Sequence, residues 1–225
     1  MTPPPAGVEC ELKLALTAAE YERLRGALPG RRGEVKQHNL FWDTSDGRLA
    51  AYRWALRLRR ESGAGQPARV SVTVKGPATR VAGSVRRTEL EAAADDDVWQ
   101  RALAGDLATE DIGGPPGEFL RQQLSLHGPL RRVLDFTNLR TRFGMDLAGA
   151  PRLLELDRTD FATGERDHEL ELELAPDGVG SPAELLLEVK AVWAAVEGLL
   201  ADHCIRAAPS PGGKFSRALR YAANR

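Results

Sequence analysis

The feature that most constrains the fold of this chain is a strict alternation of charged and apolar residues. In residues 167–174 (DHELELEL), Glu169, Glu171 and Glu173 alternate with leucines. A period of two is that of a β-strand, so the glutamates share one face and the leucines the other. Like charges side by side on a strand repel one another unless a cation lies among them. The pattern therefore predicts a sheet whose charged face is paired with opposite charges or with ligands.

The same alternation marks a series of segments along the chain. Eight segments are typical of strands, at residues 8–16, 36–42, 54–61, 69–76, 84–92, 131–143, 152–161 and 167–174. Segments rich in Gly, Pro or small residues predict loops at 62–68, 111–117, 145–151 and 207–213. Most of the connections suit antiparallel pairing, so the sequence predicts a mainly antiparallel sheet.

The charged faces of these segments differ in sign. Arg57 and Arg59 share one face of their strand, whereas Glu9 and Glu11 share a face with Lys13. One interpretation is that each polar face is exposed to water, as is common in antiparallel sheets. The recurrence favours another, a barrel with its charged faces inward, where charges must be paired or bound to ligands. Carboxylates suit Mg²⁺ or Mn²⁺, and Arg and Lys suit phosphate, so such an interior fits a metal-bound triphosphate.

Capping signals predict helices between the strands. Thr17 and Glu20 form a capping box before the segment YERLRGAL. Further helices are expected from a cap at Ser181, Pro182 and Glu184 to about Asp202, from a cap at Asp97 to Ala104, from Glu118 to Leu126, and over residues 213–223. The expected fold class is α+β, with an eight-stranded antiparallel β-barrel and helices packed outside it.

Size and composition predict one domain over residues 8–222, after a flexible lead over residues 1–7. The net charge of −1 gives no reason to expect nucleic acid or a membrane as a partner. The two cysteines, Cys10 and Cys204, form neither a zinc motif nor a disulfide framework, so a cytoplasmic location is expected. The sequence does not indicate the oligomeric state.

Several motifs occur in a fixed order and together resemble one known family. They are Glu9-x-Glu11-x-Lys13, HNLFWDTSDGRLA at 38–50, Leu56-Arg57-Leu58-Arg59, SVTVKGP with Lys75, RRTELEA with Arg87, Glu89 and Glu91, NLRTRF with Arg140 and Arg142, LELDR with Asp157, HELELEL, and GGKFSRAL with Lys214 and Arg217. This set resembles the CYTH proteins, the triphosphate tunnel metalloenzyme superfamily. The resemblance covers about residues 8–222 and implies an eight-stranded antiparallel β-tunnel.

The resemblance also implies roles for the charged residues. Mg²⁺ or Mn²⁺ would be bound by Glu9, Glu11, Asp157, Glu169, Glu171 and Glu173. The phosphates of a triphosphate or another phosphorylated small molecule would be bound by Lys13, Arg57, Arg59, Lys75, Arg87, Arg140, Arg142, Lys214 and Arg217. Lys13, Glu11 and Glu171 are the candidate catalytic residues. Two points differ from the family pattern: Gly213 replaces the usual serine before Lys214, and Glu155 has no assigned counterpart.

The implied activity is metal-dependent hydrolysis of inorganic triphosphate to pyrophosphate and phosphate. Three alternatives use the same kind of site: a class IV adenylate cyclase, a thiamine or nucleoside triphosphatase, and a module that binds polyphosphate or nucleotide without cleaving it. No Ser or Cys lies beside a base in the sequence, so a covalent intermediate is not indicated.

Overall fold

The computed structural model of the protein describes residues 7–81, 84–174 and 182–224. The chain divides into two compact units, and each is described by itself. The first unit contains Gly7 together with Lys36–Pro77 and Arg87–Thr137, and the second contains the described residues of Val8–Val35, Ala78–Arg86 and Asn138–Arg225.

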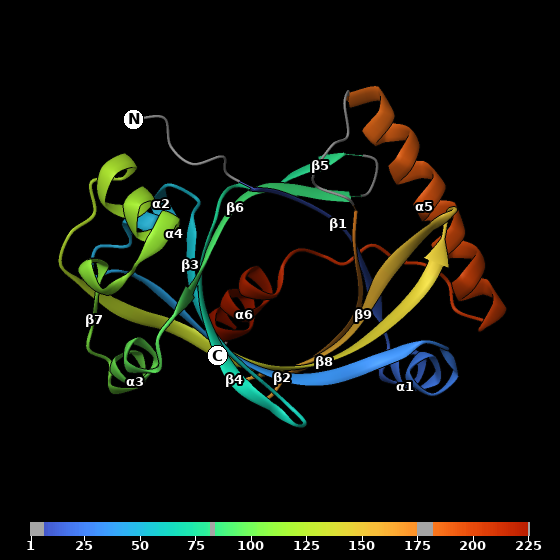
Figure 1. Ribbon diagram of the computed structural model, residues 1–225, viewed down its shortest axis with the longest axis horizontal. Helices are drawn as coiled ribbons and strands as arrows, with labels where there is room; N and C mark the ends of the chain where they lie inside the picture. Colours follow the sequence, from blue (N-terminus) through green and yellow to red (C-terminus); the bar gives the residue numbers. More distant parts are fainter. Residues whose placement is uncertain (1–6, 82–83, 175–181, 225) are drawn as a thin grey trace. The chain divides into compact units, whose positions relative to one another are not determined.

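An antiparallel sheet whose strands are hydrogen-bonded in a closed ring is the main feature of the fold (Figure 1). The ring runs in the order β1 (Gly7–Leu16), β10 (Arg166–Glu173), β9 (Ala150–Phe161), β8 (Pro129–Leu147), β2 (Arg31–Thr44), β3 (Ala55–Gly63), β4 (Gln66–Lys75) and β6 (Ser84–Ala94), which pairs again with β1. Two further short strands pair at its margins, β5 (Thr79–Val81) with β6 and β7 (Leu107–Ala108) with β8. The predicted α+β fold with a ring of eight strands is confirmed.

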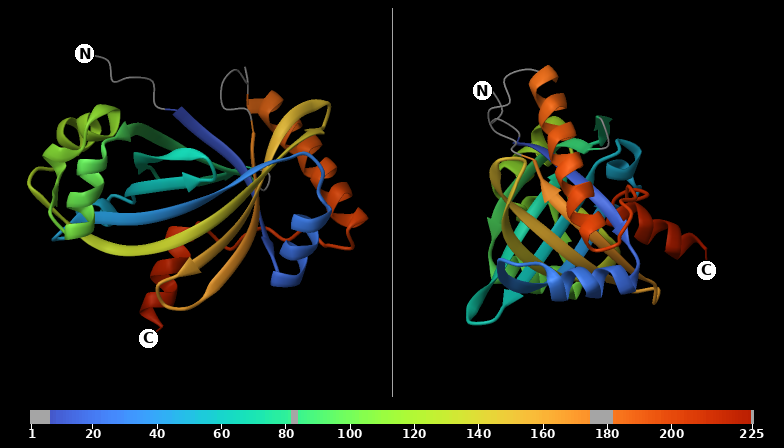
Figure 2. Two further views of the ribbon diagram at one scale, coloured as in Figure 1. Left: turned by 60° about the horizontal axis from the view of Figure 1, so that its bottom comes forward. Right: turned by 90° about the vertical axis from the view of Figure 1, so that its right-hand side faces the viewer.

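In the second unit, strand register separates an apolar face of the sheet from a charged one. Leu12 of β1 lies opposite Leu172 of β10, while the neighbouring residue, Lys13, lies opposite Glu171. The leucine face is covered by α1 (Ala18–Ala27) and α5 (Pro182–Asp202), which share one buried hydrophobic core with it (Figures 1 and 2). The helix α6 (Lys214–Ala223) instead sends Lys214 to the charged face. Burial of the leucines thus forces the charged side chains onto the opposite side.

The first unit repeats this division. Leu56 of β3 lies opposite Val74 of β4, and the next residue, Arg57, lies opposite Thr73. The apolar face packs against Trp99 of α3 (Asp96–Ala104) and against the short segments around α4 (Gly114–Glu118). The remaining elements of this unit are α2 (Arg48–Ala51), a 3₁₀ turn at Thr109–Asp111 and a π-helical turn at Phe119–Gln123.

Some predicted boundaries were wrong, mostly because strands continue into segments expected to be loops. β3 and β4 extend into 62–68, and β8 and β9 extend into 145–151, so only tight turns remain. Asp97 lies inside α3, which Asp95 precedes as the N-cap residue, and most of α4 lies within the segment 111–117 that was expected to be a loop. The predicted helix from Glu118 is instead the end of α4 and the π-helical turn. The expected cap at Ser181 lies outside the described residues, whereas the capping box of Thr17 and Glu20 is confirmed.

Across the described ranges 7–81, 84–174 and 182–224, no helix is long and apolar enough to cross a membrane.

Candidate functional site

The charged face of the second unit carries a network that we call the ionic cluster. It consists of four carboxylates and four cations, contributed by strands β1, β8, β9 and β10 and by helix α6: Glu11, Asp157, Glu169, Glu171, Lys13, Arg140, Lys214 and Arg217. All four carboxylates are buried, and Asp157 is fully inaccessible to solvent. The possibility that these acidic faces are simply solvated therefore does not hold for this part of the sheet.

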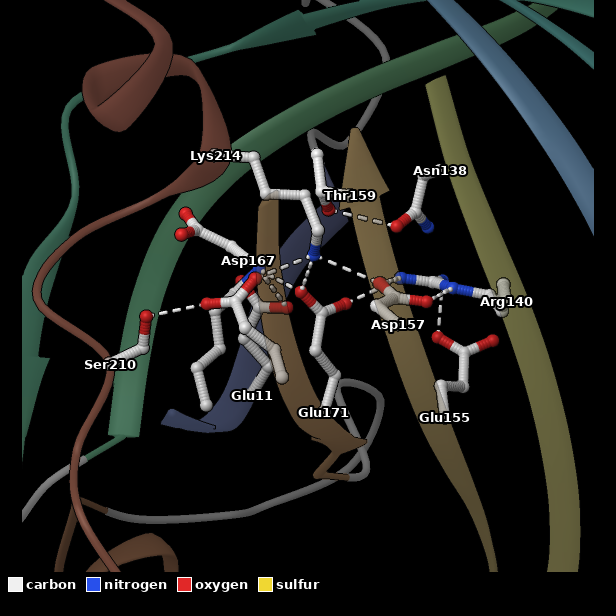
Figure 3. Close-up of polar contacts among 12 residues, drawn as sticks. Glu11, Asn138, Arg140, Glu155, Asp157, Thr159, Asp167, Glu171, Ser210 and Lys214 are labelled. Atoms are coloured by element: carbon white, nitrogen blue, oxygen red, sulfur yellow. Dashed lines mark hydrogen bonds and ion pairs between the residues drawn. The ribbon is translucent and has the colours of Figure 1, made fainter. Parts of the chain in front are cut away.

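Lys214 lies at the centre of the ionic cluster. Its Nζ atom is 2.9 Å from Asp157, 2.8 Å from Glu169 and 2.5 Å from Glu171 (Figure 3). These carboxylates come from β9 and β10, while Lys214 is the first residue of α6. Lys13 of β1 adds a second ammonium, 3.1 Å from Glu11 and 2.8 Å from Glu171. The two lysines thus neutralise the like charges that the alternating sequence brings together.

Arg140 supports the cluster from β8. Its Nε and Nη2 atoms donate to the two oxygens of Asp157, at 2.8 and 2.6 Å, and Nη2 also donates to Glu171. Nη1 of Arg140 pairs with Glu155 (Figure 3). Glu155 also accepts a hydrogen bond from Arg142. A bidentate fork of this kind binds carboxylates strongly and in a fixed orientation.

The charges of the ionic cluster shift the pKa values of its members. Burial alone raises the pKa of Asp157, but the charges of Arg140 and Lys214 outweigh it and lower the pKa to about 2. Burial likewise opposes the effect of Lys214 on Glu169, whose pKa falls to about 2, and the pKa of Glu171 is also lowered. Burial lowers the pKa of Lys13, yet Glu11 and Glu171 raise it further, so the net pKa is raised. All of these groups are therefore ionised at neutral pH.

The first unit carries a separate set of polar side chains on β3, β4 and β6. Nη2 of Arg57 donates to the hydroxyl of Thr73 at 2.9 Å, and this hydroxyl donates to Glu91 at 2.8 Å. Lys75 pairs with Glu89 at 2.8 Å, and Arg59 donates to Asn39. Nε of Arg57 is buried and has no hydrogen-bond partner within the described part of the chain. A buried guanidinium with a free donor is suited to an anionic ligand.

The predicted site residues thus fall into groups. The ionic cluster brings together Glu11, Lys13, Arg140, Asp157, Glu169, Glu171, Lys214 and Arg217. Arg142 lies beside it through Glu155, while Glu9 is partly buried and Glu173 is exposed at the end of β10. Arg57, Arg59, Lys75 and Arg87 lie in the first unit.

Several residues of the network were not among the predicted site residues. Ser210 donates to Glu169 at 2.5 Å, and Asp167 accepts from Arg217 at 2.6 Å and from Tyr221 at 2.9 Å. Asp167 shares the face of Glu169 two residues earlier, and Tyr221 lies one helical turn after Arg217, so periodicity could have found both. Ser210 lies in a loop, which no periodic pattern could have revealed.

The ionic cluster fits a divalent metal in its donor chemistry, because carboxylate oxygens are the ligands that Mg²⁺ and Mn²⁺ prefer. Among the described residues, however, no group of three or more His, Cys, Asp or Glu is arranged as a metal site. The ammonium of Lys214 lies where three carboxylates converge and balances their charge.

Comparison with known proteins agrees with this architecture. The family model described as the CYTH domain matches residues 7–186. HpAC1 from Hippeastrum, described as an adenylyl cyclase candidate with a dominant triphosphatase activity, is 23% identical with a TM-score of 0.76, covering 94% of this chain and 95% of that one. An adenylate cyclase candidate from Bacillus halodurans is 23% identical with a TM-score of 0.62, covering 94% and 98%.

A third solved structure, the PH1819 protein from Pyrococcus horikoshii, is 16% identical with a TM-score of 0.60, covering 94% of this chain and 98% of that one. At these identities the solved structures support the fold alone. No curated protein matches the sequence. The CYTH model spans most of the chain, including the strands that carry Glu11, Arg140, Asp157 and Glu171. The chain therefore belongs to the CYTH domain family.

Proposed function

We propose that this protein is a divalent-metal-dependent triphosphatase that hydrolyses inorganic triphosphate to pyrophosphate and phosphate. The observation that carries the proposal is the ionic cluster, in which buried carboxylates of β1, β9 and β10 are paired with cations of β1, β8 and α6. A site that only held an anion would have little use for four buried carboxylates, and a site that only held a metal would have little use for the four cations beside them.

The charge balance of the cluster explains how it would accept such a ligand. Without ligand, Lys13, Lys214 and Arg140 neutralise the carboxylates. A triphosphate with its metal carries both signs of charge. Its phosphate oxygens would pair with the cations, and the carboxylates would pair with the metal. This exchange keeps every buried charge paired, which avoids the large cost of leaving one unpaired.

Glu11, Asp157, Glu169 and Glu171 are the carboxylates that would hold the metal, with Glu9 and Glu173 as predicted contributors. When bound, a divalent metal supplies neutralisation of phosphate charge and lowers the pKa of a coordinated water.

The cations of the chain would position the phosphates and stabilise charge on the leaving pyrophosphate. Hydrolysis adds a water oxygen to the terminal phosphorus and breaks the bridging P–O bond. Burial lowers the pKa of Lys13, but Glu11 and Glu171 outweigh it and raise the pKa in the absence of ligand. In this proposal Lys13 serves as a cation that binds phosphate. Arg57, Arg59, Lys75, Arg87 and Arg142 remain predicted phosphate ligands from the resemblance.

Adenylate cyclase activity is the second candidate, because two of the similar structures are described as cyclase candidates. The one from Hippeastrum is also described as having a dominant triphosphatase activity, which favours hydrolysis as the first candidate. A thiamine or nucleoside triphosphatase would differ only in the group attached to the phosphates. A binding module would retain affinity without turnover.

The test is product analysis with purified protein and Mg²⁺ or Mn²⁺. Triphosphate, ATP and thiamine triphosphate are compared for phosphate release, and cyclic AMP is assayed from ATP. Faster phosphate release from triphosphate than from the other two supports the proposal. Cyclic AMP with pyrophosphate from ATP would move the protein to the cyclase candidate, and binding without any turnover would favour the binding module.

A further inference from the structure

Arg217 is the most deeply buried cation of the ionic cluster, with only 3% of its surface exposed. The motif predicts it as a phosphate ligand, but its surroundings differ from those of the other cations. Each of its three guanidinium nitrogens lies within 2.8 Å of a protein oxygen. A phosphate ligand needs donors that can reach the substrate, whereas Nε and Nη1 of Arg217 already donate to the protein and Nη2 lies in an ion pair with Glu169 without hydrogen-bond geometry.

Two carboxylates of β10 contact the guanidinium of Arg217. Nη1 and Nη2 of Arg217 lie 2.8 Å from Oε1 and Oε2 of Glu169, and Nε donates to Asp167 at 2.6 Å. Nη1 also donates to the hydroxyl of Ser210 and to the carbonyl oxygen of Gly212. The guanidinium fork of Arg217 therefore contacts both oxygens of Glu169, through a hydrogen bond from Nη1 and an ion pair at Nη2, which restrains the orientation of that carboxylate.

Two further groups hold the fork in place. The hydroxyl of Tyr221, one turn along α6, donates to Oδ1 of Asp167 at 2.9 Å. The hydroxyl of Ser210 accepts from Arg217 and donates to Oε1 of Glu169. Oε2 of Glu169 also forms an ion pair with Nζ of Lys214, at 2.8 Å. Glu169 is thus the one carboxylate of the cluster that is held by Arg217.

We propose that Arg217 is a positioning residue, which orients the carboxylate of Glu169 for the metal and does not bind the substrate phosphates. The inference rests on the proposed function, since it assigns Glu169 to the metal. Partners of this kind, which orient a metal-binding carboxylate through hydrogen bonds, commonly affect metal affinity or activity by about 10- to 100-fold. Asp167, Ser210 and Tyr221 support Arg217 in this role.

A cavity of about 420 Å³ adjoins this network. Arg217, Asp167, Glu169, Ser210 and Tyr221 line it together with the exposed Arg220. Truncation of Arg217 to alanine would enlarge this cavity beside Glu169. A small guanidinium compound could then occupy the vacated space, which permits a chemical rescue experiment.

The experiment compares wild type with Arg217→Lys and Arg217→Ala, and uses Arg220→Ala as the matched control on the same helix. Arg217→Lys keeps the positive charge but lacks the planar guanidinium. It provides the comparison with wild type if the alanine variant fails to fold. Calorimetry measures Mn²⁺ affinity in the absence of substrate and triphosphate affinity in the presence of excess chelator. Steady-state kinetics with Mn²⁺ give kcat and KM for triphosphate. Thermal unfolding reports the integrity of each variant.

We expect the Mn²⁺ affinity and the kcat of both Arg217 variants to be about 10- to 100-fold below those of wild type. Triphosphate affinity without metal should change by less than about twofold, and Arg220→Ala should match wild type. Ethylguanidinium, but not ethylammonium, should restore kcat of the alanine variant.

Loss of metal-free triphosphate affinity with unchanged Mn²⁺ affinity would instead make Arg217 a phosphate ligand. Equal losses in every measurement together with a lowered unfolding temperature would show a merely structural role. If wild type is active and the Arg217 variants have the same Mn²⁺ affinity and kcat, this inference alone is overturned. If wild type neither binds Mn²⁺ nor cleaves triphosphate, the proposed function is overturned as well.

Discussion

The guanidinium of Arg140 donates to the carboxylate of Glu171 at 2.5 Å, although Arg140 lies on β8 and Glu171 on β10. Strand β9 lies between those two strands, and its Asp157 accepts two further hydrogen bonds from the same guanidinium. One side chain therefore ties three neighbouring strands together through buried charges.

Arg140→Gln should lower the free energy of unfolding by about 3–5 kcal/mol, because it leaves buried carboxylates without their cation. Arg158→Gln on β9 is the matched control. Arg158 is one-third exposed and pairs with Asp160 at 3.5 Å, so its loss should cost less than about 1 kcal/mol. Urea unfolding of the metal-free proteins gives both values. Equal costs for the two variants would contradict the role assigned to Arg140.

Glu11→Gln should reduce turnover of triphosphate by at least about 100-fold while preserving the fold, because an amide keeps the shape but not the charge that a metal requires. Glu173→Gln offers a comparison on the facing strand, since Glu173 lies opposite Glu11 in the register but is exposed. We expect it to lose less than about tenfold. Phosphate release is measured alongside thermal unfolding, and full activity of the Glu11 variant would contradict a role in metal binding.

Stability of the metal-free protein should fall as the pH is lowered from about 4.5 to 2. Burial raises the pKa of Glu169, but Lys214 and Arg217 outweigh it and lower the pKa from 4.5 to about 2. A carboxyl with a lowered folded-state pKa stabilises the fold above its unfolded value, and this contribution is lost as the pH falls through the folded value. The contribution is on the order of 3 kcal/mol.

The measurement is the free energy of unfolding against pH in the presence of chelator. Glu169→Gln should flatten the curve between pH 4.5 and 2, while Glu197→Gln, an exposed acid on α5, should leave the slope unchanged. A slope for Glu169→Gln that equals that of wild type would contradict the assignment of the pKa shift.

Thr73→Val should cost about 1–3 kcal/mol of stability, because the buried guanidinium of Arg57 loses its hydrogen-bond acceptor, while Glu91 is exposed to water. Valine matches threonine in shape, so packing is preserved. Thr73→Ser retains the hydroxyl and should cost less. Chemical unfolding of the three proteins provides the comparison, and a loss for Thr73→Ser equal to or larger than that for Thr73→Val would contradict the role assigned to the hydroxyl.

Gly30→Ala should be strongly destabilising, because φ at Gly30 is +72° and an added Cβ would lie 2.1 Å from the carbonyl oxygen of Gly144. No flexible side chain could move aside, since the obstacle is backbone. Gly26→Ala is the control: this residue lies within α1, has φ in the ordinary range and meets nothing within 4 Å of the added Cβ. It should stabilise the protein by up to about 1 kcal/mol. Thermal unfolding temperatures should therefore move in opposite directions.

Periodic patterns in the sequence predicted most of the sheet. The alternation around Glu169 and Glu171 placed every leucine of β10 on one face, and the structure confirms that division. Strand ends were harder to predict, because β2 begins at Arg31 through hydrogen bonds that no local pattern encodes. β5 and β7 were missed because strands of two or three residues carry no detectable period.

The membership of the ionic cluster was predicted better than its contacts. The family resemblance identifies Lys214 and Asp157, but their 2.9 Å separation depends on how α6 docks against β9. Ser210 shows the limit most clearly. Gly213 lacks the hydroxyl that the motif leads one to expect, and the structure supplies one to Glu169 from three residues earlier. Only tertiary structure could reveal that replacement.

The pairing of β1 with β10 has a consequence for folding during synthesis. Lys13 and Glu171 are 158 positions apart, so the ring of strands closes through contacts of very long range in the chain. Such contacts form slowly, because loop-closure entropy must be lost before the contact stabilises anything. One edge of β1 can pair with β6, but the other stays unpaired until residues 166–173 have been synthesised. The acidic residues of β9 and β10 are neutralised later still, once Lys214 has been synthesised. Early strands with unpaired edges are prone to aggregation, so chaperone dependence should be greatest in this interval.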